Sequence, residues 1–346
     1  MDLSEFDFPF DPSLIASQPL LPRDQARMLV LDPLSGSLAH HIVADLPDHL
    51  VAGDVVVVND TKVRSARVPC KKRSSGAPVD VLFVREEADR LWEVLMKGKW
   101  KEGDVLDVGA DARLLVKTRA ERTVVQVEGA VSMAELFERH GRMPLPPYIK
   151  RAPDRNDREW YQTVFARKEG AIAAPTAGLH FTPDLLSRLE GKGIGIARVT
   201  LHVGIGTFKP VTVERVEEHR MGVEWVEVDE ATVQAIQRAK QAGRKTVAVG
   251  TTVVRALESA AAQEGGLQPY RGETGLFIVP GFSFRVVDAL LTNFHLPRTT
   301  LLMLVSAFGG KGLLRQAYQE AVARRYRFYS YGDAMLIRQK AKSEGR

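Results

Sequence analysis

Four consecutive valines occupy residues 55–58, after the turn signal Ala52-Gly53 and before the polar exit Asn59-Asp60-Thr61. A strand without polar alternation is typical of a strand buried on both faces, as in parallel sheets. Such a strand needs neighbours of its own kind. Before residue 150 the sequence predicts only one other candidate, at 26–31. We therefore expect this early strand to pair with strands from much later in the chain.

The stretch from about residue 66 to residue 150 has a different pattern. Short alternating segments between glycine- and charge-rich turns predict a small β-barrel or sandwich; the expected strands are 78–85, 92–96, 105–108, 113–118 and 122–128. A helix is expected at 133–140. The string MPLPPY (143–148) holds three prolines in six residues, which helix and central-strand interiors exclude. It is interpreted as the connection leading out of the β module.

After residue 150, strand and helix patterns alternate, which predicts a largely parallel α/β sheet. The expected helices are 183–191, 229–242, 253–264 and 313–325, and the expected strands are 194–203, 245–249, 276–278, 290–291 and 329–337. The predicted fold class is α/β. A main mixed or parallel α/β domain is built from both ends of the chain (1–66 and 151–346), and a small antiparallel β-barrel domain (67–150) is inserted into it.

Composition excludes several classes of protein. The chain has 346 residues, of which 45% are hydrophobic, and a single cysteine, Cys70. No internal disulfide is possible and no Cys/His grouping has zinc spacing, so we expect no metal and a cytoplasmic location. The N-terminus is acidic and lacks a signal-peptide pattern. The apolar runs fall far short of the ~20 residues that span a bilayer. We expect a monomer without membrane contact.

The charge is unevenly distributed. Residues 1–60 carry 2 Lys/Arg and 10 Asp/Glu, a balance of −8, whereas the remaining residues carry 46 and 33, a balance of +13. The densest basic stretch predicts an RNA-binding surface that neutralises phosphates; it consists of Lys62, Arg64, Arg67, Lys71, Lys72 and Arg73. A second group at 324–331 mixes arginines with aromatic residues. It is interpreted as either a base-stacking surface or a helix end followed by core aromatics.

Three strings place a histidine among small residues at element boundaries: His180 in APTAGLHFTP (174–183), His202 in TLHVGIGTFKP (200–210) and His295 in LTNFHLPRTTL (291–301). Each alone is interpreted as a structural loop imidazole. Together they predict a shared site, because ligands of open α/β sheets bind where the carboxyl ends of strands converge. Histidine is also the usual general base near neutral pH. The glycine turn of the second string is neither a P-loop nor a dinucleotide fingerprint.

The pattern of residues 245–260 predicts a strand, a tight turn and a helix. Gly250 permits the turn, and Thr251 or Thr252 is expected to cap the helix. Arg255 is expected in the first helical turn, where a cation opposes the helix dipole. Two interpretations remain open for Arg255. It pairs with an anionic ligand or a buried carboxylate, or it forms an ordinary salt bridge with Glu258 or with an acid elsewhere in the chain.

Taken together, these strings resemble one family, the S-adenosylmethionine:tRNA ribosyltransferase-isomerases of queuosine biosynthesis. The resemblance covers nearly the whole chain in the family's order and lies in LVAGDVVVVNDTKVRSARV (50–68), MPLPPYIKR (143–151), YQTVFA (161–166), AAPTAGLHFTPDLL (173–186), VTLHVGIGTFKPV (199–211), VAVGTTVVRALES (247–259), LFIVPGF (276–282), LLTNFHLPRTTLLMLVSAF (290–308) and YRFYSYGDAMLI (326–337). One departure is that residues 219–222 read His-Arg-Met-Gly, where the family usually has His-Arg-Met-His.

The resemblance implies a transferase that modifies tRNA. It would transfer and isomerise the ribosyl moiety of S-adenosylmethionine onto 7-aminomethyl-7-deazaguanine at the wobble position, giving epoxyqueuosine, adenine and methionine. The partners would be that tRNA and S-adenosylmethionine as co-substrate, with no prosthetic group. Two alternatives remain open: a non-catalytic RNA-binding protein, and an α/β enzyme that acts on a small nucleotide without RNA.

The implied chemistry suggests roles for individual residues. A carbon next to a sulfonium is acidic, so a neutral histidine can remove the ribosyl 5′ proton; the candidates are His180, His202 and His295. The aminomethyl group of the tRNA must be neutral, and Asp60 or Asp333 would hold or deprotonate it. The remaining candidates would bind S-adenosylmethionine: Gly204 and Gly206 by close backbone approach, Arg255 through the methionine carboxylate, and Thr176, Gly178, Thr207 and Thr251 as loop residues.

Overall fold

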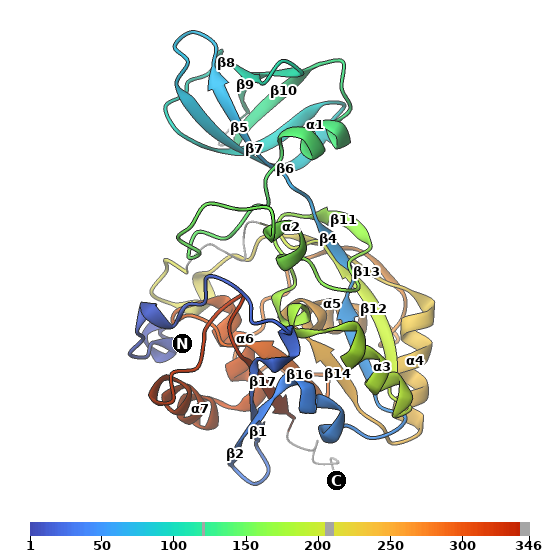
Figure 1. The fold of residues 1–346 in the computed structure, drawn as a ribbon. Coiled ribbons are helices and arrows are strands. Elements are labelled where there is room, and N and C mark those ends of the chain that lie inside the picture. The colour runs from blue at the N-terminus through green and yellow to red at the C-terminus, as the bar shows by residue number, and fades with distance from the viewer. Residues whose placement is uncertain (120–121, 205–210, 340–346) are drawn as a thin grey trace.

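The computed structural model describes residues 1–119, 122–204 and 211–339. A closed β-barrel stands above a larger α/β body, and two chain segments form the neck between them (Figure 1). One segment leads from β4 (Thr61–Val63) into the barrel. The other returns through the proline-rich segment, residues 143–153, toward α2 (Asp157–Trp160).

The body is organised around a nine-stranded mixed sheet in the order β15-β13-β12-β3-β14-β16-β17-β1-β2. Its centre is four parallel strands: β12 (Gly195–Leu201), β3 (Val55–Asn59), β14 (Thr246–Val249) and β16 (Ala289–Asn293). The flanking strands are β15 (Tyr270–Thr274), β13 (Glu224–Val228), β17 (Ala334–Arg338), β1 (Arg27–Asp32) and β2 (Ser37–Ile42). The early valine strand therefore pairs on both sides with strands from beyond residue 190.

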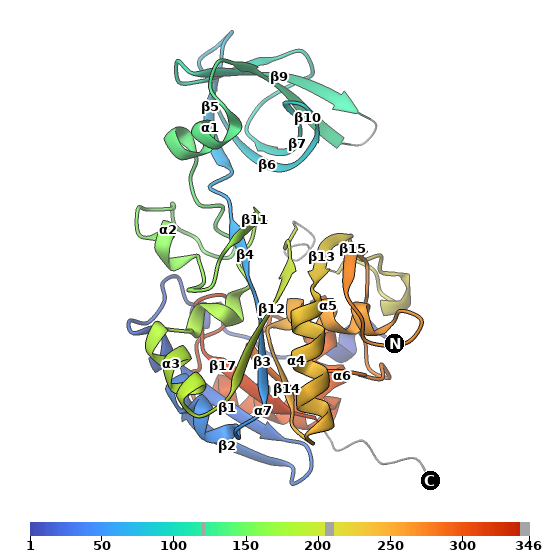
Figure 2. The ribbon, with the colours of Figure 1, turned by 90° about the vertical axis from the view of Figure 1, so that its right-hand side faces the viewer.

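Every residue of β3 is buried because both faces of the sheet are covered. Val55 and Val57 face one core, and Val56 and Val58 face the other. The first core is covered by α4 (Glu230–Gln241), α5 (Thr251–Ala261), α6 (Thr300–Gly309) and α7 (Lys311–Ala323). The second is covered by α3 (Pro183–Gly191) and the 3-10 helices η4 (Val43–His49) and η5 (Thr176–His180). Figure 2 shows α4 and α3 on opposite sides of the sheet.

The barrel closes in the order β10-β7-β6-β5-β8-β9, from β5 (Arg67–Lys72), β6 (Pro78–Ala88), β7 (Leu91–Lys97), β8 (Val105–Val108), β9 (Ala112–Arg119) and β10 (Arg122–Gly129). Helix α1 (Met133–His140) packs Phe137 into its core. The Phe137 ring lies 5.3 Å from Phe83 and 5.7 Å from Trp92, both edge-on. Such edge contacts suit the ring quadrupoles.

The predicted fold class is confirmed: a mixed α/β sheet assembled from both ends of the chain, with an antiparallel barrel inserted. Two helix predictions, 133–140 and 183–191, match the observed bounds. Two strand predictions are wrong. Residues 276–278 form no strand, because β15 (Tyr270–Thr274) is the strand that pairs with β13. The last strand begins only at Ala334, because the preceding residues form a turn in which Tyr329 has φ +71°.

The remaining elements are short. A two-stranded sheet joins β4 to β11 (Lys168–Ala171), and further 3-10 helices are η1 (Leu3–Phe6), η2 (Pro12–Leu14), η3 (Arg23–Gln25) and η7 (Val216–Glu218). Among the described residues, no helix combines the length and the apolar character needed to cross a membrane.

The neck predicts a steric test. A Cβ built on Gly141 comes within 2.0 Å of the Ser65 carbonyl oxygen, so the two neck segments touch here with no room for a methyl group. We expect Gly141→Ala to lower the free energy of unfolding by about 1–3 kcal/mol, the usual cost of overpacking. Gly191→Ala is the matched control, because its Cβ meets nothing within 4 Å. Equal melting temperatures of the two variants in calorimetry would contradict the expectation.

Candidate active site

A pocket lies at the carboxyl ends of three of the four parallel strands. Val203 reaches it just beyond β12, Gly250 just beyond β14, and Asn293 at the end of β16. Converging strand ends are where ligands bind in open α/β sheets. The pocket is therefore a candidate for the site predicted from the three histidine strings.

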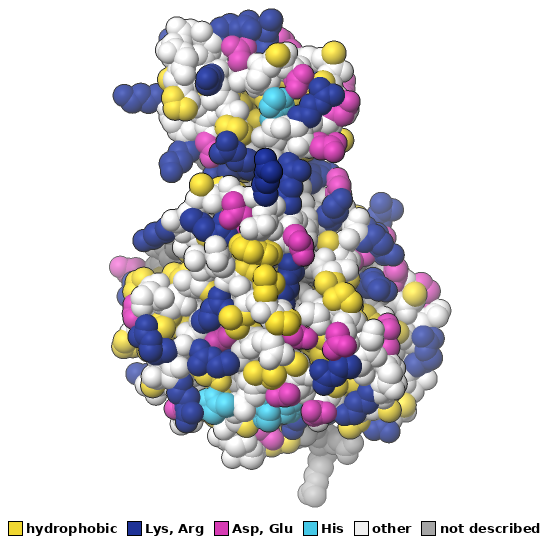
Figure 3. All heavy atoms as spheres, in the orientation of Figure 1, with side chains coloured by type: hydrophobic (Ala, Val, Ile, Leu, Met, Phe, Trp, Pro, Cys, Tyr) yellow, Lys and Arg dark blue, Asp and Glu magenta, His cyan; other side chains and the backbone are white. Residues whose placement is uncertain are grey.

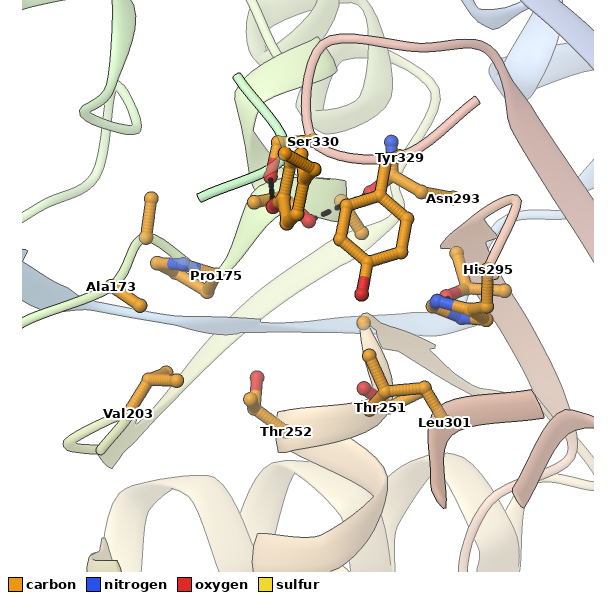
Figure 4. Close-up of a pocket in the computed structure, with 16 residues that line it drawn as sticks. Ala173, Pro175, Val203, Thr251, Thr252, Asn293, His295, Leu301, Tyr329 and Ser330 are labelled. Carbon is orange, nitrogen blue, oxygen red and sulfur yellow. Dashed lines mark hydrogen bonds between the residues drawn. The ribbon is translucent and has the colours of Figure 1, made fainter. Parts of the chain in front are cut away.

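None of the described residues lining the pocket is a Lys, Arg, Asp or Glu. Hydroxyl and amide groups supply its polarity, and small or apolar residues supply the rest; the lining is Tyr148, Ala173, Ala174, Pro175, Thr176, Ala177, Val203, Gly250, Thr251, Thr252, Thr292, Asn293, His295, Leu301, Tyr329 and Ser330. Figure 4 shows these side chains converging from several elements. A concave pocket with apolar walls and a few oriented polar groups is typical of a small-molecule site.

The N-terminus of α5 forms one side of the pocket. Gly250 at the N-cap has φ +91°, a conformation that favours glycine, and no side chain caps the helix. The expected cap by Thr251 or Thr252 is therefore wrong. The first backbone N–H groups of a helix have no acceptor within it and form the positive end of its dipole. Both threonines line the pocket, so this helix end faces any ligand there.

A buried hydrogen-bond network orients Asn293. The Thr176 hydroxyl donates to Asn293 Oδ1 at 3.0 Å, and Asn293 Nδ2 lies 3.1 Å from His180 Nε2. The His180 ring also hydrogen-bonds to the backbone of Arg23, and burial lowers its pKa to about 4. His180 does not line the pocket; it contacts Asn293, which does, and helps to fix the orientation of the Asn293 side chain.

Of the three predicted histidines, His295 alone lines the pocket. Its Nε2 lies 3.0 Å from the Thr292 hydroxyl, and its backbone N–H donates to the Tyr318 hydroxyl at 2.9 Å. The side chain is buried, and burial lowers its pKa to about 3. The imidazole is therefore neutral at physiological pH.

His202 lies elsewhere. Its Nδ1 is 2.8 Å from the Thr61 hydroxyl, and its ring stacks on Trp225 with centroids 5.2 Å apart. Gly170 lies against the other side, where a Cβ would come within 2.5 Å of the imidazole. Partial burial lowers its pKa. The described pocket therefore does not bring the three histidines together: His202 and Val203 follow the end of β12, and Val203 lines the pocket whereas His202 does not.

Sequence reasoning missed a tyrosine pair in the pocket. Tyr148, from the proline-rich segment, packs on Tyr329 with centroids 3.9 Å apart and hydrogen-bonds through its hydroxyl to Ser330 Oγ at 2.5 Å. Tyr329 has φ +71°, which is rare outside glycine and concentrates at functional sites. Its hydroxyl points across the pocket toward Thr251 (Figure 4). Burial raises its pKa to about 12, so the phenol is a neutral donor.

The two predicted carboxylates are held by arginines outside the pocket. Asp60 accepts from the Thr200 hydroxyl at 2.6 Å and pairs with Arg167 at 2.9 Å. Asp333 pairs with Arg27 at 2.9 Å. Both carboxylates are buried, and the pocket lining includes neither. The structure thus separates these side chains from the ligand site that they were expected to serve.

Arg255 is committed to protein groups. It forms a buried ion pair with Glu224 and donates from Nε to the Leu276 carbonyl at 3.0 Å. The buried-carboxylate interpretation is therefore confirmed, with Glu224 rather than Glu258 as the partner. Glu224 also accepts from the Gly204 N–H at 2.8 Å. Gly178 packs against Thr163 and Phe165, and Gly206 and Thr207 lie outside the described residues.

Four of the six predicted RNA-binding cations pair with carboxylates from elsewhere in the chain. The pairs are Lys62–Glu169, Arg67–Asp80, Lys72–Asp104 and Arg73–Asp107, at 2.7–2.8 Å. Arg64 lies over the Trp92 ring at 6.0 Å. The aromatic residues of the second basic group are core residues, because Tyr326, Phe328 and Tyr331 are buried. The base-stacking interpretation of that group is wrong for these three rings.

Comparisons with known proteins agree over the whole chain. Residues 3–337 match the family model described as queuosine biosynthesis protein. S-adenosylmethionine:tRNA ribosyltransferase-isomerases from Geotalea uraniireducens and Aquifex aeolicus are 48% and 46% identical to the chain, covering 97% of it and all of each relative. The crystal structure of S-adenosylmethionine tRNA ribosyltransferase from Thermotoga maritima covers 96% of the chain and all of its own, with 36% identity and a TM-score of 0.56.

The chain belongs to this family. The family resemblance and the transferase class inferred from sequence are confirmed. At the fourth position of the string 219–222, where the family usually has histidine, this chain has Gly222. A Cβ built on Gly222 would meet nothing within 4 Å. Packing among the described residues therefore does not require glycine at this position.

The two buried histidines predict how stability depends on pH. Burial lowers the pKa of His180 from 6.5 to about 4 and that of His295 to about 3. Between these values and pH 6.5 the unfolded chain binds protons that the folded chain excludes. The free energy of unfolding should therefore fall as the pH is lowered below 6.5, by up to about 1.4 kcal/mol per pH unit for each histidine.

Urea titrations of a His180→Gln/His295→Gln variant between pH 7 and pH 4.5 would check this. The variant should show a shallower loss of stability than the wild-type protein. Lys117→Gln, at an exposed position on β9, is the control and should keep the wild-type slope. Identical slopes in all three proteins would contradict the expectation.

Proposed function

We propose that the pocket binds S-adenosylmethionine and that the chain transfers and isomerises its ribosyl moiety onto 7-aminomethyl-7-deazaguanine at the wobble position of a tRNA. The products are epoxyqueuosine, adenine and methionine. One observation carries the site assignment: an uncharged pocket at the meeting point of three parallel strand ends, in a chain of this family. The proposed setting is a monomer in the cytoplasm.

The pocket suits the charges of this ligand. A sulfonium is a fixed cation, and neither a buried lysine nor a neutralising carboxylate faces it among the described lining residues. The methionine carboxylate is an anion, and the N-terminus of α5 at Thr251 and Thr252 offers N–H groups and a favourable dipole. We propose this helix end as the carboxylate site. The helix end replaces Arg255 as the proposed partner of the methionine carboxylate, because the Arg255 guanidinium already pairs with Glu224.

His295 is the proposed base. It is neutral, buried and in the pocket, and Thr292 orients its ring. The Tyr329 hydroxyl donates a hydrogen bond from the opposite wall, and Asn293 is held in one orientation by Thr176 and His180. We propose that Asp60 and Asp333, which are anchored by arginines, stabilise the surrounding loops and do not handle the incoming amine.

The decisive experiment uses the complete protein. Incubation with S-adenosylmethionine and a tRNA bearing the aminomethyl base should release adenine and methionine, and nucleoside mass spectrometry should detect the ribosyl-derived mass increment on the tRNA. A tRNA without the aminomethyl group is the matched control and should remain unchanged. Turnover of S-adenosylmethionine with a free nucleoside alone, or binding of tRNA without any turnover, would contradict the proposal and favour one of the two alternatives.

Histidine variants separate the proposed base from its neighbours. His295→Asn should lower the rate of adenine release about 100-fold or more, the usual scale for a general base, while calorimetry still detects S-adenosylmethionine binding. His202→Asn should stay within a few-fold of wild type, because that ring lies outside the pocket. Since the pKa of His295 is about 3, wild-type kcat should show no acid limb from this residue between pH 8 and pH 5. Equal rates in both variants would remove His295 from this role.

A further inference from the structure

A second hollow, of about 1170 Å³, lies between the barrel and the proline-rich segment. One wall is the outer face of strands β5, β6 and β7, and the other is residues 145–153. We call this hollow the neck groove. Strand pairing places Arg67, Leu82 and Leu95 in one row on the barrel wall, and Asp80 and Lys97 in the next.

The neck groove combines apolar surface with positive charge. Leu95 is 45% exposed, although leucine usually lies in the core, and the prolines of residues 145–153 face it from the other wall. The lining includes four cations and one carboxylate: Arg67, Lys97, Lys150 and Arg151 against Asp80. Figure 3 shows Lys and Arg side chains gathered where the barrel meets the body.

The ion pairs show which of these cations can meet a ligand. Arg67 is bonded to Asp80 at 2.7 Å, and Arg151 is bonded twice to Asp157 at 2.6 Å. Lys97 and Lys150 are both exposed, one on each wall. Lysines on opposite walls with apolar side chains between them suit a single-stranded polynucleotide, in which phosphates alternate with exposed base faces.

The neck groove and the pocket share a wall. Pro147 and Ile149 line the neck groove, whereas Tyr148 between them lines the pocket. Residues 146–149 form a turn in which the Ile149 N–H donates to the Pro146 carbonyl at 3.0 Å, and this turn presents Pro147 and Ile149 to the neck groove and Tyr148 to the pocket. A polynucleotide lying in the neck groove is therefore beside the site proposed for S-adenosylmethionine.

We propose that the neck groove binds single-stranded nucleotides of the anticodon loop, next to the base that is modified. Lys97 and Lys150 contact phosphates, and the exposed Leu95 packs against a base. A duplex would offer phosphates but no free base face for Leu95, whereas an RNA loop offers both. This inference rests on the proposed function and adds the surface on which the tRNA substrate lies.

The test measures tRNA and S-adenosylmethionine separately. Lys97→Glu and Lys150→Glu should each raise the KM for tRNA about tenfold, in keeping with the loss of a phosphate contact. The calorimetric Kd for S-adenosylmethionine should stay within twofold of wild type. Lys117→Glu, on β9 and outside the neck groove, is the matched charge reversal and should leave both constants unchanged.

A second measurement locates the RNA. A photo-crosslinking amino acid at position 95 should react with anticodon-loop nucleotides of bound tRNA. If wild type is active but the lysine variants keep the wild-type KM for tRNA, or if the crosslinks map to the acceptor arm, the neck-groove inference is overturned while the proposed function stands. If wild type shows no turnover, the proposed function itself fails.

Discussion

The central constraint in this structure is that β3 must be covered on both faces. Val55 and Val57 belong to one core and Val56 and Val58 to the other, so the strand cannot be stable at an edge or against water. Its neighbours β12 and β14 come from residues 195–249, which forces the first 60 residues to fold with the second half of the chain. The barrel is then necessarily an insertion, connected by a narrow neck.

The same arrangement creates the pocket proposed as the active site. Three of the parallel strands, which end at one edge, bring Val203, Gly250 and Asn293 together, although these residues are far apart in the sequence. Covering helices bury the edge deeply enough to keep His180 and His295 neutral. We propose that S-adenosylmethionine binds in this uncharged pocket and that the tRNA binds at the neck, where the lining carries four cations and one carboxylate.

Ion pairs between residues far apart in the sequence explain why several charged residues do not act as the local sequence suggested. Arg255 pairs with Glu224, Asp60 with Arg167, and Asp333 with Arg27. Each partner is at least 31 residues away in the chain, so no local pattern identifies it. Lys72 and Arg73 are likewise neutralised by Asp104 and Asp107, whose strand lies beside β5 only once the barrel has closed. Counting the basic residues in a stretch of sequence therefore overestimates how many unpaired cations the folded surface offers to a ligand.

The α/β class, the inserted barrel, the family and the bounds of two helices follow from the sequence alone, because periodicity, turn residues and long motifs are local signals. Three of the predicted site residues, His295, Thr176 and Thr251, line the pocket beyond the strand ends, and their roles stay predictions. Which side chains face the pocket depends on the tertiary fold. His202 and Val203 are adjacent just beyond β12, yet His202 stacks on Trp225 and Val203 lines the pocket. Tyr148 and Tyr329 meet only because the neck folds back over the body, a contact across 181 residues that no local pattern encodes.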